Sequence, residues 1–157
     1  MLPKPKFKAS ERPKIDSSNK AFNFLCSNWS DDKIEFLGEF KIILLNRANH
    51  VLGIVNISQG GLAGTYVDPK IIFSIALKAN FSGIILSHNH PSGQCQPTQA
   101  DVELTKRMVQ TGALLELPIL DHIIVCLDCY YSFKDEGLIW IYCSCICRSP
   151  FFSDSVS

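Results

Sequence analysis

Two histidines and one aspartate in a short segment have the types and spacing of metal ligands. His88 and His90 are two positions apart, so their side chains project to the same face if they close a strand. Two imidazoles on one face can take two positions of a tetrahedral Zn²⁺ site. Asp101 follows at the start of an expected helix, where its carboxylate can supply a third ligand and leave the fourth position for water.

Each of these residues also has an ordinary structural explanation. Thr98 and Asp101 have the spacing of a capping box, in which Thr98 caps the helix and Asp101 bonds back to the Thr98 amide. Histidines at a strand exit have many uses besides metal binding. The conjunction of two same-face histidines, a tight Pro/Gly loop and a carboxylate 11 residues after His90 favours a metal site. An HNH nuclease is rejected, because that motif consists of separated residues in a ββα unit.

This segment resembles a known family. His88-x-His90-x7-Thr98-x2-Asp101 matches the JAMM motif of JAB/MPN-type metalloproteins, with Thr in place of Ser. The wider sequence resembles RadC, a bacterial JAB-domain family, through residues 88–93, 97–101, 104–105, 120–124 and 130–137. RadC proteins usually begin with a helix-hairpin-helix segment, and this sequence shows none, so we expect a stand-alone JAB domain.

The resemblance implies a fold and a reaction. The fold is α/β, a mixed α+β sheet flanked by helices, of JAB/MPN type with a cytidine-deaminase-like architecture. The reaction is Zn²⁺-dependent hydrolysis of a peptide or isopeptide bond, with a glutamate as general base on the water. Glu39, which opens the β-rich run 39–45, is the expected base, and Glu35 is the rival. The Thr98 hydroxyl would donate to the tetrahedral oxyanion.

Two other functions remain open. One is a DNA-repair-associated accessory protein with a structural or vestigial metal, and the other is a non-catalytic scaffold that binds a partner. The retained ligands argue against the scaffold. Asp121 and His122 belong to the RadC-like pattern, and they either support the metal site from behind or form a hydrogen-bonded core pair.

The surrounding pattern predicts the elements that position these residues. A hairpin is expected from strands at 39–45 and 51–55, followed by a loop at Gly60, Gly61 and Gly64. The remaining expectations are a helix from Ser17 or Ser18, a helix opened by Asp68-Pro69 with Ile72, Ile75, Ala76 and Ala79 on one face, a strand at 83–87, a helix at 98–113 and a strand at 119–127. This order gives one mixed α/β domain.

Composition sets the boundaries of the domain. The chain has 157 residues, 46% hydrophobic and 19% charged, which suits a single folded domain. Its net charge is zero, but residues 1–20 carry six basic and two acidic side chains. We expect a basic flexible arm at 1–20 that either contacts nucleic acid or only aids solubility, the JAB domain at 21–138, and an apolar, cysteine-rich tail at 139–157. A dimer is compatible with these data.

The seven cysteines are expected to be reduced thiols rather than disulfides, because the basic start of the chain lacks a secretory signal and indicates the cytoplasm. Cys126-x2-Cys129, with Cys143, Cys145 and Cys147, is a poor match to a second zinc site, and a redox role fits less well still. Cys95 is interpreted as an incidental neighbour of the metal ligands. No apolar run reaches the length of a membrane span.

Overall fold

The computed structural model describes residues 7–59, 67–78 and 81–139. Its elements, in chain order, are a 3-10 helix at Ala9–Glu11, α1 at Ser18–Ser27, α2 at Asp31–Ile34, β1 at Glu39–Leu45, β2 at Val51–Gln59, α3 at Pro69–Lys78, β3 at Gly83–Asn89, α4 at Gln99–Leu114, β4 at Ile119–Val125 and β5 at Tyr130–Ser132. The expected glycine loop, Ala79 and the cysteines of the tail lie outside the described residues.

The five strands form one mixed sheet in the order β2-β1-β3-β4-β5. The β1–β2 hairpin is antiparallel, as the sequence predicts, and β1 also pairs antiparallel with β3. β3 and β4 are parallel, because α4 carries the chain back between them. Their two C-terminal ends therefore meet at the same edge of the sheet. The α2 and β5 elements, of 4 and 3 residues, were not expected from the pattern.

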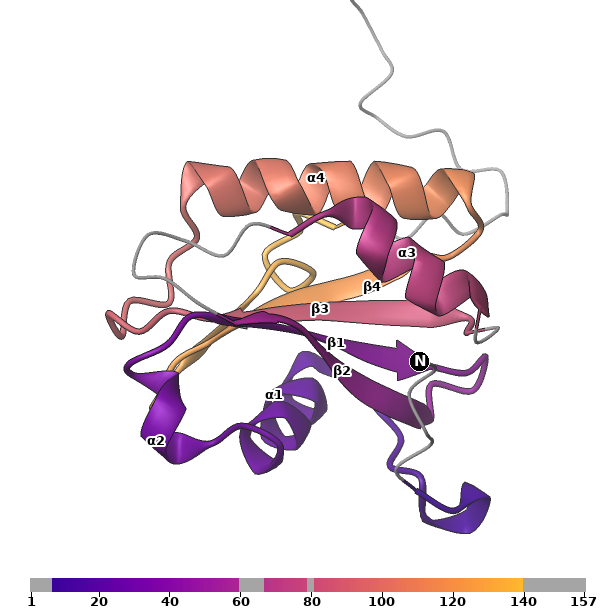
Figure 1. Cartoon of the computed structure of the whole chain (residues 1–157), viewed down its shortest axis with the longest axis horizontal. Coiled ribbons are helices and arrows are strands. Elements are labelled where there is room, and N and C mark those ends of the chain that lie inside the picture. Colours follow the sequence, from indigo (N-terminus) through magenta and orange to yellow (C-terminus); the bar gives the residue numbers. More distant parts are fainter. Residues whose placement is uncertain (1–6, 60–66, 79–80, 140–157) are drawn as a thin grey trace, which may run out of the picture.

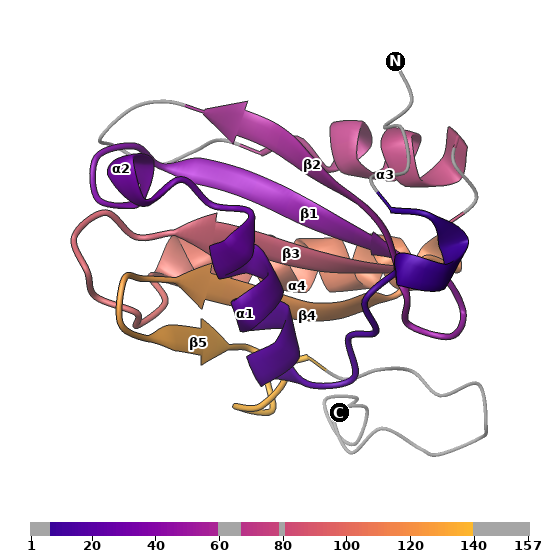
Figure 2. The same ribbon diagram turned by 90° about the horizontal axis from the view of Figure 1, so that it is seen from below.

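The sheet separates two hydrophobic cores. Helices α3 and α4 cover one face, and α1 covers the other (Figures 1 and 2). Strand β1 shows how the alternation works: Phe40, Ile42 and Leu44 belong to the core on the α3/α4 side, while Ile43 and Leu45 belong to the core on the α1 side. All seven residues of β1 and all seven of β3 are buried, so the strand that leads to the histidines is held on both faces.

Each of the longer helices begins at the residue that the sequence indicates. The Ser17 side chain accepts a hydrogen bond from the Lys20 amide at the start of α1. An Asp68 carboxylate oxygen accepts from the Lys70 amide, 2.9 Å away, at the start of α3. Thr98 caps α4. These predicted starts are confirmed.

The folded domain begins before residue 21. Ile15 is 5% exposed and lies in the core on the α1 side. The Val51 amide donates to the Pro13 carbonyl at 2.9 Å, and the Ile15 amide donates to the Asn49 carbonyl at 2.9 Å. Residues 13–15 are therefore bound to the β1–β2 hairpin, and the expected flexible arm does not extend through them.

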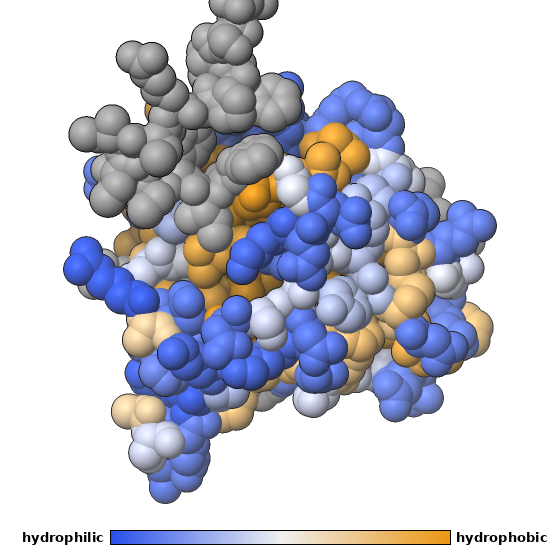
Figure 3. Space-filling view, turned by 180° about the vertical axis from the view of Figure 1, so that it is seen from behind, coloured by the Kyte–Doolittle hydropathy of each residue, from blue (hydrophilic) through white to orange (hydrophobic). Residues whose placement is uncertain are grey.

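The outer surface is mixed in character. Figure 3 shows the side of the molecule opposite to that seen in Figure 1. Mostly hydrophilic side chains surround a smaller group of hydrophobic ones there. Within residues 7–59, 67–78 and 81–139, no helix has the length and apolar content needed to cross a membrane.

Candidate metal centre

His88, His90 and Asp101 converge at the end of β3. The His88 Nε2 atom lies 3.1 Å from Asp101 Oδ1, and His90 Nε2 lies 3.3 Å from Asp101 Oδ2. The two Nε2 atoms are 3.0 Å apart. The pairing of Phe40 with His88 fixes the register of β3 against β1, and the Phe40 ring stacks on the His88 ring. The two histidines share a face, as their spacing predicts.

Asp101 serves as helix cap and as site residue at the same time. The Thr98 hydroxyl accepts from the Asp101 amide at 3.2 Å, while Asp101 Oδ2 accepts from both the Thr98 amide and the Thr98 hydroxyl at 2.7 Å each. The full capping box is present. It orients the carboxylate toward the histidines, so the two explanations of Thr98 and Asp101 do not compete. The Thr98 hydroxyl proton is directed at Asp101.

A chain of hydrogen bonds determines which nitrogen each histidine presents. Thr105 Oγ1 donates to the Asp101 carbonyl at 2.6 Å and lies 2.6 Å from His122 Nδ1. With that hydroxyl proton committed, His122 Nδ1 donates to Thr105, and His122 Nε2 accepts from His88 Nδ1, 2.8 Å away. His90 Nδ1 donates to the Gln94 carbonyl at 2.7 Å. Both ligand histidines therefore keep a proton on Nδ1 and direct Nε2 toward Asp101, where it can bind a metal ion in place of a proton.

Electrostatics keep the carboxylate charged and the buried histidine neutral. Burial opposes the charge on Asp101, but its hydrogen bonds to His88 and His90 outweigh that effect and hold its pKa far below the ordinary value. The hydrogen bond to Asp101 raises the pKa of His90. Burial lowers the pKa of His122 well below its ordinary value, so this ring is neutral and can accept from His88.

This donor set is one that could hold a metal ion. Three ligand atoms, two imidazole nitrogens and one carboxylate oxygen, lie within 4.8 Å of one another. The two Nε2 atoms are 3.0 Å apart and each is close to an Asp101 oxygen, so a proton or a cation at this point is favoured by all three groups. The ligand side chains are between 11% and 16% exposed, which leaves the site open to solvent on one side. Three protein ligands with one open side are the arrangement of catalytic zinc sites.

Glu39 lies on the opposite face of the sheet from the ligands. Its neighbour Phe40 faces His88, so Glu39 itself projects the other way. A Glu39 carboxylate oxygen lies 3.1 Å from Lys41 Nζ, which lies 4.7 Å from the centre of the Trp29 ring in the core on the α1 side. The structure therefore does not bring the expected general base to the metal ligands.

The other predicted residues are placed as follows. Glu35, the rival base, is exposed at the end of α2. His122 is fully buried and contacts the ligand His88 directly. Asp121 faces away from the site and accepts from the His122 amide, the Ser132 hydroxyl and the Lys134 amide at 2.7, 2.7 and 3.1 Å. Burial is the largest effect on Asp121 and raises its pKa to about 6.

Asn89 is a structural residue that the sequence reasoning missed. Its side chain accepts from the Glu39 amide at 2.7 Å and donates to the carbonyls of Ile34 and Leu37 at 2.6 and 2.8 Å. It fastens the segment after α2 to the end of β3, on the face opposite the histidines. The signal was present in the sequence, because a polar residue between two same-face histidines must itself face the other way.

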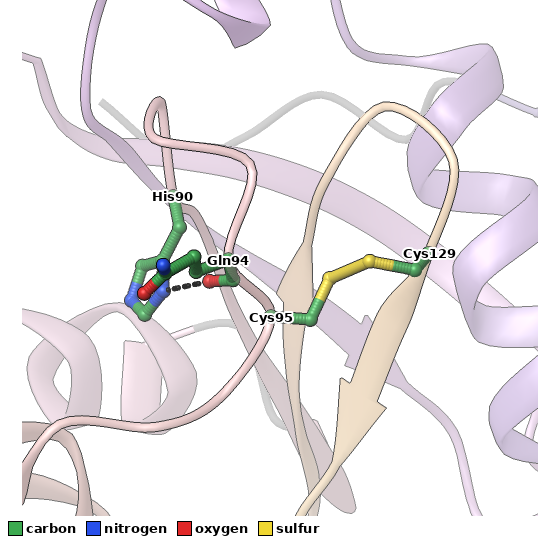
Figure 4. Close-up of a disulfide and its surroundings, with 4 residues drawn as sticks. All are labelled: His90, Gln94, Cys95 and Cys129. Atoms are coloured by element: carbon green, nitrogen blue, oxygen red, sulfur yellow. Dashed lines mark hydrogen bonds between the residues drawn. A yellow bond between two sulfur atoms is a disulfide. The ribbon is translucent and has the colours of Figure 1, made fainter.

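Cys95 and Cys129 form a disulfide, which corrects the expectation that the cysteines are all reduced. Cys95 lies in the loop between His90 and α4, and Cys129 lies in the turn between β4 and β5 (Figure 4). The two are 34 residues apart in sequence. They meet because the parallel strands β3 and β4 end at the same edge, a tertiary relation that sequence spacing does not contain. Among the described residues, Cys26 and Cys126 are free thiols.

The mixed sheet with flanking helices and a His/His/Asp cluster at the end of β3 agrees with the α+β fold of a JAB-type domain. A family model described as the RadC-like JAB domain matches residues 15–138. The chain therefore belongs to the RadC-like JAB family. The start of the match at residue 15 agrees with the burial of Ile15.

Several relatives that match this chain are named UPF0758 proteins. A UPF0758 protein of Flavobacterium johnsoniae is 42% identical over 125 residues, which cover 80% of this chain and 53% of the relative. A UPF0758 protein of Alkaliphilus metalliredigens is 40% identical over 126 residues, with 80% and 53% covered, and one of Symbiobacterium thermophilum is 36% identical over 136 residues, with 84% and 57% covered. The chain thus spans about half the length of the curated relatives it matches.

Proposed function

We propose that this chain is a zinc-dependent hydrolase that cleaves peptide or isopeptide bonds. The observation that carries the proposal is the convergence of two imidazole Nε2 atoms, whose Nδ1 atoms are engaged elsewhere, and one charged carboxylate at a partly open site. His88, His90 and Asp101 would hold the ion. When bound, Zn²⁺ lowers the pKa of a water molecule and polarises a substrate carbonyl.

The chain's own residues prepare the site for that ion. His122 and the Gln94 carbonyl hold the Nδ1 protons of His88 and His90, which keeps the Nε2 atoms directed inward. The hydrogen bonds of the capping box hold the Asp101 carboxylate in one orientation. Such fixed orientation is what allows a catalytic group to act without reorganising during the reaction.

The contacts of Thr98 and Glu39 differ from the roles that the motif leads us to expect for them. The Thr98 hydroxyl donates to Asp101, so a role toward a substrate oxyanion requires that this proton turn away from the carboxylate. Glu39 is separated from the ligands by the sheet and is paired with Lys41. The proposal of hydrolysis therefore depends on the three ligands and not on Glu39.

The test is metal-dependent cleavage of a diverse peptide library, read by mass spectrometry of the products. We expect the zinc-loaded chain to cleave amide bonds, and His88→Ala to cleave no faster than the metal-stripped protein. The matched control is His50→Ala, because His50 is the histidine of the described residues that lies outside the site. A zinc-loaded chain that cleaves no bond, or equal cleavage by His88→Ala, would contradict the proposal.

The same assay tests the general base. From the placement of Glu39 we expect Glu39→Gln to retain metal-dependent cleavage once any loss of folded protein is corrected for. Loss of cleavage in a folded, zinc-loaded Glu39→Gln chain would restore the sequence-based assignment of Glu39. Glu35→Gln, which changes an exposed carboxylate, is run in parallel.

A further inference from the structure

Three cysteines meet at the edge of the sheet beside the histidine site. Their Sγ atoms lie within 4.8 Å of one another. Cys95 comes from the loop before α4, while Cys126 and Cys129 flank the turn between β4 and β5. Figure 4 shows Cys95 reaching across to Cys129 from the loop that also holds Gln94 and His90. None of the three belongs to the His88, His90 and Asp101 cluster.

A disulfide alone does not account for this arrangement. The Cys95–Cys129 bond uses two of the sulfurs and leaves Cys126 as a buried free thiol at the same place. Cys126 and Cys129 have the C-x2-C spacing of a zinc half-site. Their turn is closed by a hydrogen bond of 2.9 Å from the Cys126 amide to the Cys129 carbonyl. The sequence lacked a convincing partner for this pair, and the structure supplies Cys95.

We propose that Cys95, Cys126 and Cys129 form a second metal site, for a thiophilic divalent cation such as Zn²⁺, which the Cys95–Cys129 disulfide closes. Thiolates are the ligands that select soft and borderline metals. Sulfurs in a tetrahedral zinc site lie about 3.8 Å apart, which is within the span of this cluster. Cys129 is exposed and Cys95 is half-buried, so a cation can enter from solvent while Cys126 forms the floor.

Reduction by a phosphine converts the disulfide form of the site to the thiol form that can bind a cation. A trialkylphosphine takes up the oxygen of one water molecule, the Cys95–Cys129 bond breaks, and each sulfur receives one of the two protons. The phosphine is oxidised to its oxide and the disulfide is reduced to two thiols. Binding of the cation then displaces the three thiol protons.

The second site is independent of the hydrolase proposal but lies on the same loop. Cys95 directly follows Gln94, whose carbonyl holds the Nδ1 proton of His90. The cysteine ligands and the histidine ligands are nevertheless different atoms of different residues. Failure of one proposal can therefore be told from failure of the other.

The test is a cobalt titration of the full chain before and after reduction with the phosphine. Thiolate ligands give Co²⁺ a sulfur-to-metal charge-transfer band in the near ultraviolet, which imidazole and carboxylate ligands do not. We expect one added equivalent of cobalt with this band in the reduced chain and no such band in the oxidised chain. Added zinc should bleach the band, because zinc forms tighter thiolate complexes.

Matched variants assign the band to the three sulfurs. We expect Cys126→Ser and Cys129→Ser to lose it, and Cys26→Ser and His88→Ala to keep it. Because Cys129 is exposed, we expect its substitution to leave the fold intact even if that of Cys126 does not. The series is repeated with serine at Cys143, Cys145 and Cys147. A band that disappears with those three, that survives both Cys126→Ser and Cys129→Ser, or that never forms would overturn the proposal.

Discussion

His122 decides which nitrogen His88 offers to a metal. It is fully buried between His88 and Thr105 and does not belong to the ligand group of His88, His90 and Asp101. Its ring stacks on Phe133 at 4.9 Å between centroids, so its orientation is fixed from both sides. It is a positioning residue, and its effect should appear in metal affinity.

His122→Phe tests this role. Phenylalanine can fill the space of the ring but cannot accept the Nδ1 proton of His88, so we expect zinc affinity to fall by about 10- to 100-fold. Competition titration against a chelating dye measures the change. His122→Gln is the conservative control, because its amide oxygen can accept that proton. Equal zinc affinity of the wild-type and His122→Phe chains would show that the hydrogen bond does not orient the ligand.

Asp121 should make stability depend on pH. Its pKa is raised to about 6, mainly by burial. The folded chain therefore binds this proton more tightly than the unfolded chain does, so the contribution of Asp121 to the free energy of unfolding falls as pH rises from about 4 to about 6 and is level above that.

Asp121→Asn removes this titration while keeping acceptors for the His122 and Lys134 amides. We expect the free energy of unfolding of the variant, relative to that of the wild type, to increase by roughly 2 kcal/mol as the pH rises from 4 to 7. Urea unfolding of both chains at each pH gives the difference. A difference that is constant with pH, or that moves in the other direction, would contradict the raised pKa.

At the scale of the element, the side chains at the end of β3 have two different roles. His88 and His90 face the metal site, and Asn89 between them faces the segment after α2. The strand is buried along its whole length, which fixes the direction of the His88 and Asn89 side chains, and His90 directly follows it. One strand therefore positions two ligands and fastens a neighbouring connection.

Asn89→Ala should be strongly destabilising. It removes three hydrogen bonds and leaves the Glu39 amide and the Ile34 and Leu37 carbonyls without that partner. We expect a loss of about 2–4 kcal/mol in the free energy of unfolding. Denaturant unfolding measures it, with Asn56→Ala on the exposed part of β2 as the control. A loss no greater than that of the control would mean that the clamp contributes little.

Local patterns in the sequence predict the hairpin, the capped helices and the shared face of the histidines, because each depends on neighbouring residues. Alternation along one strand places His88 and His90 on the same face. The face that Glu39 occupies relative to them also depends on the register between β1 and β3, which the sequence does not reveal. Pairing of Phe40 with His88 turns Glu39 to the other face. The meeting of Cys95 with Cys129 is likewise tertiary. α2 and β5 are too short to give a periodic signal.

At the scale of the whole molecule, both candidate metal sites lie where the parallel strands end. Side chains from β3, the loop after it and the β4–β5 turn meet at this edge, outside the carboxyl ends of β3 and β4. The two hydrophobic cores hold the sheet on either face, so the edge is formed by rigid elements. This arrangement explains how a chain of modest size can present a preorganised site.

The most direct test of the central claim is the zinc bound per chain at neutral pH, measured by equilibrium dialysis and elemental analysis. The Cys95–Cys129 disulfide is kept intact so that the cysteine site stays closed. We predict one zinc fewer per chain in His88→Ala and in Asp101→Asn than in the wild type, and no change in His50→Ala. Equal zinc in the wild type and His88→Ala, or none in the wild type, would contradict the assignment of His88, His90 and Asp101 as a metal site.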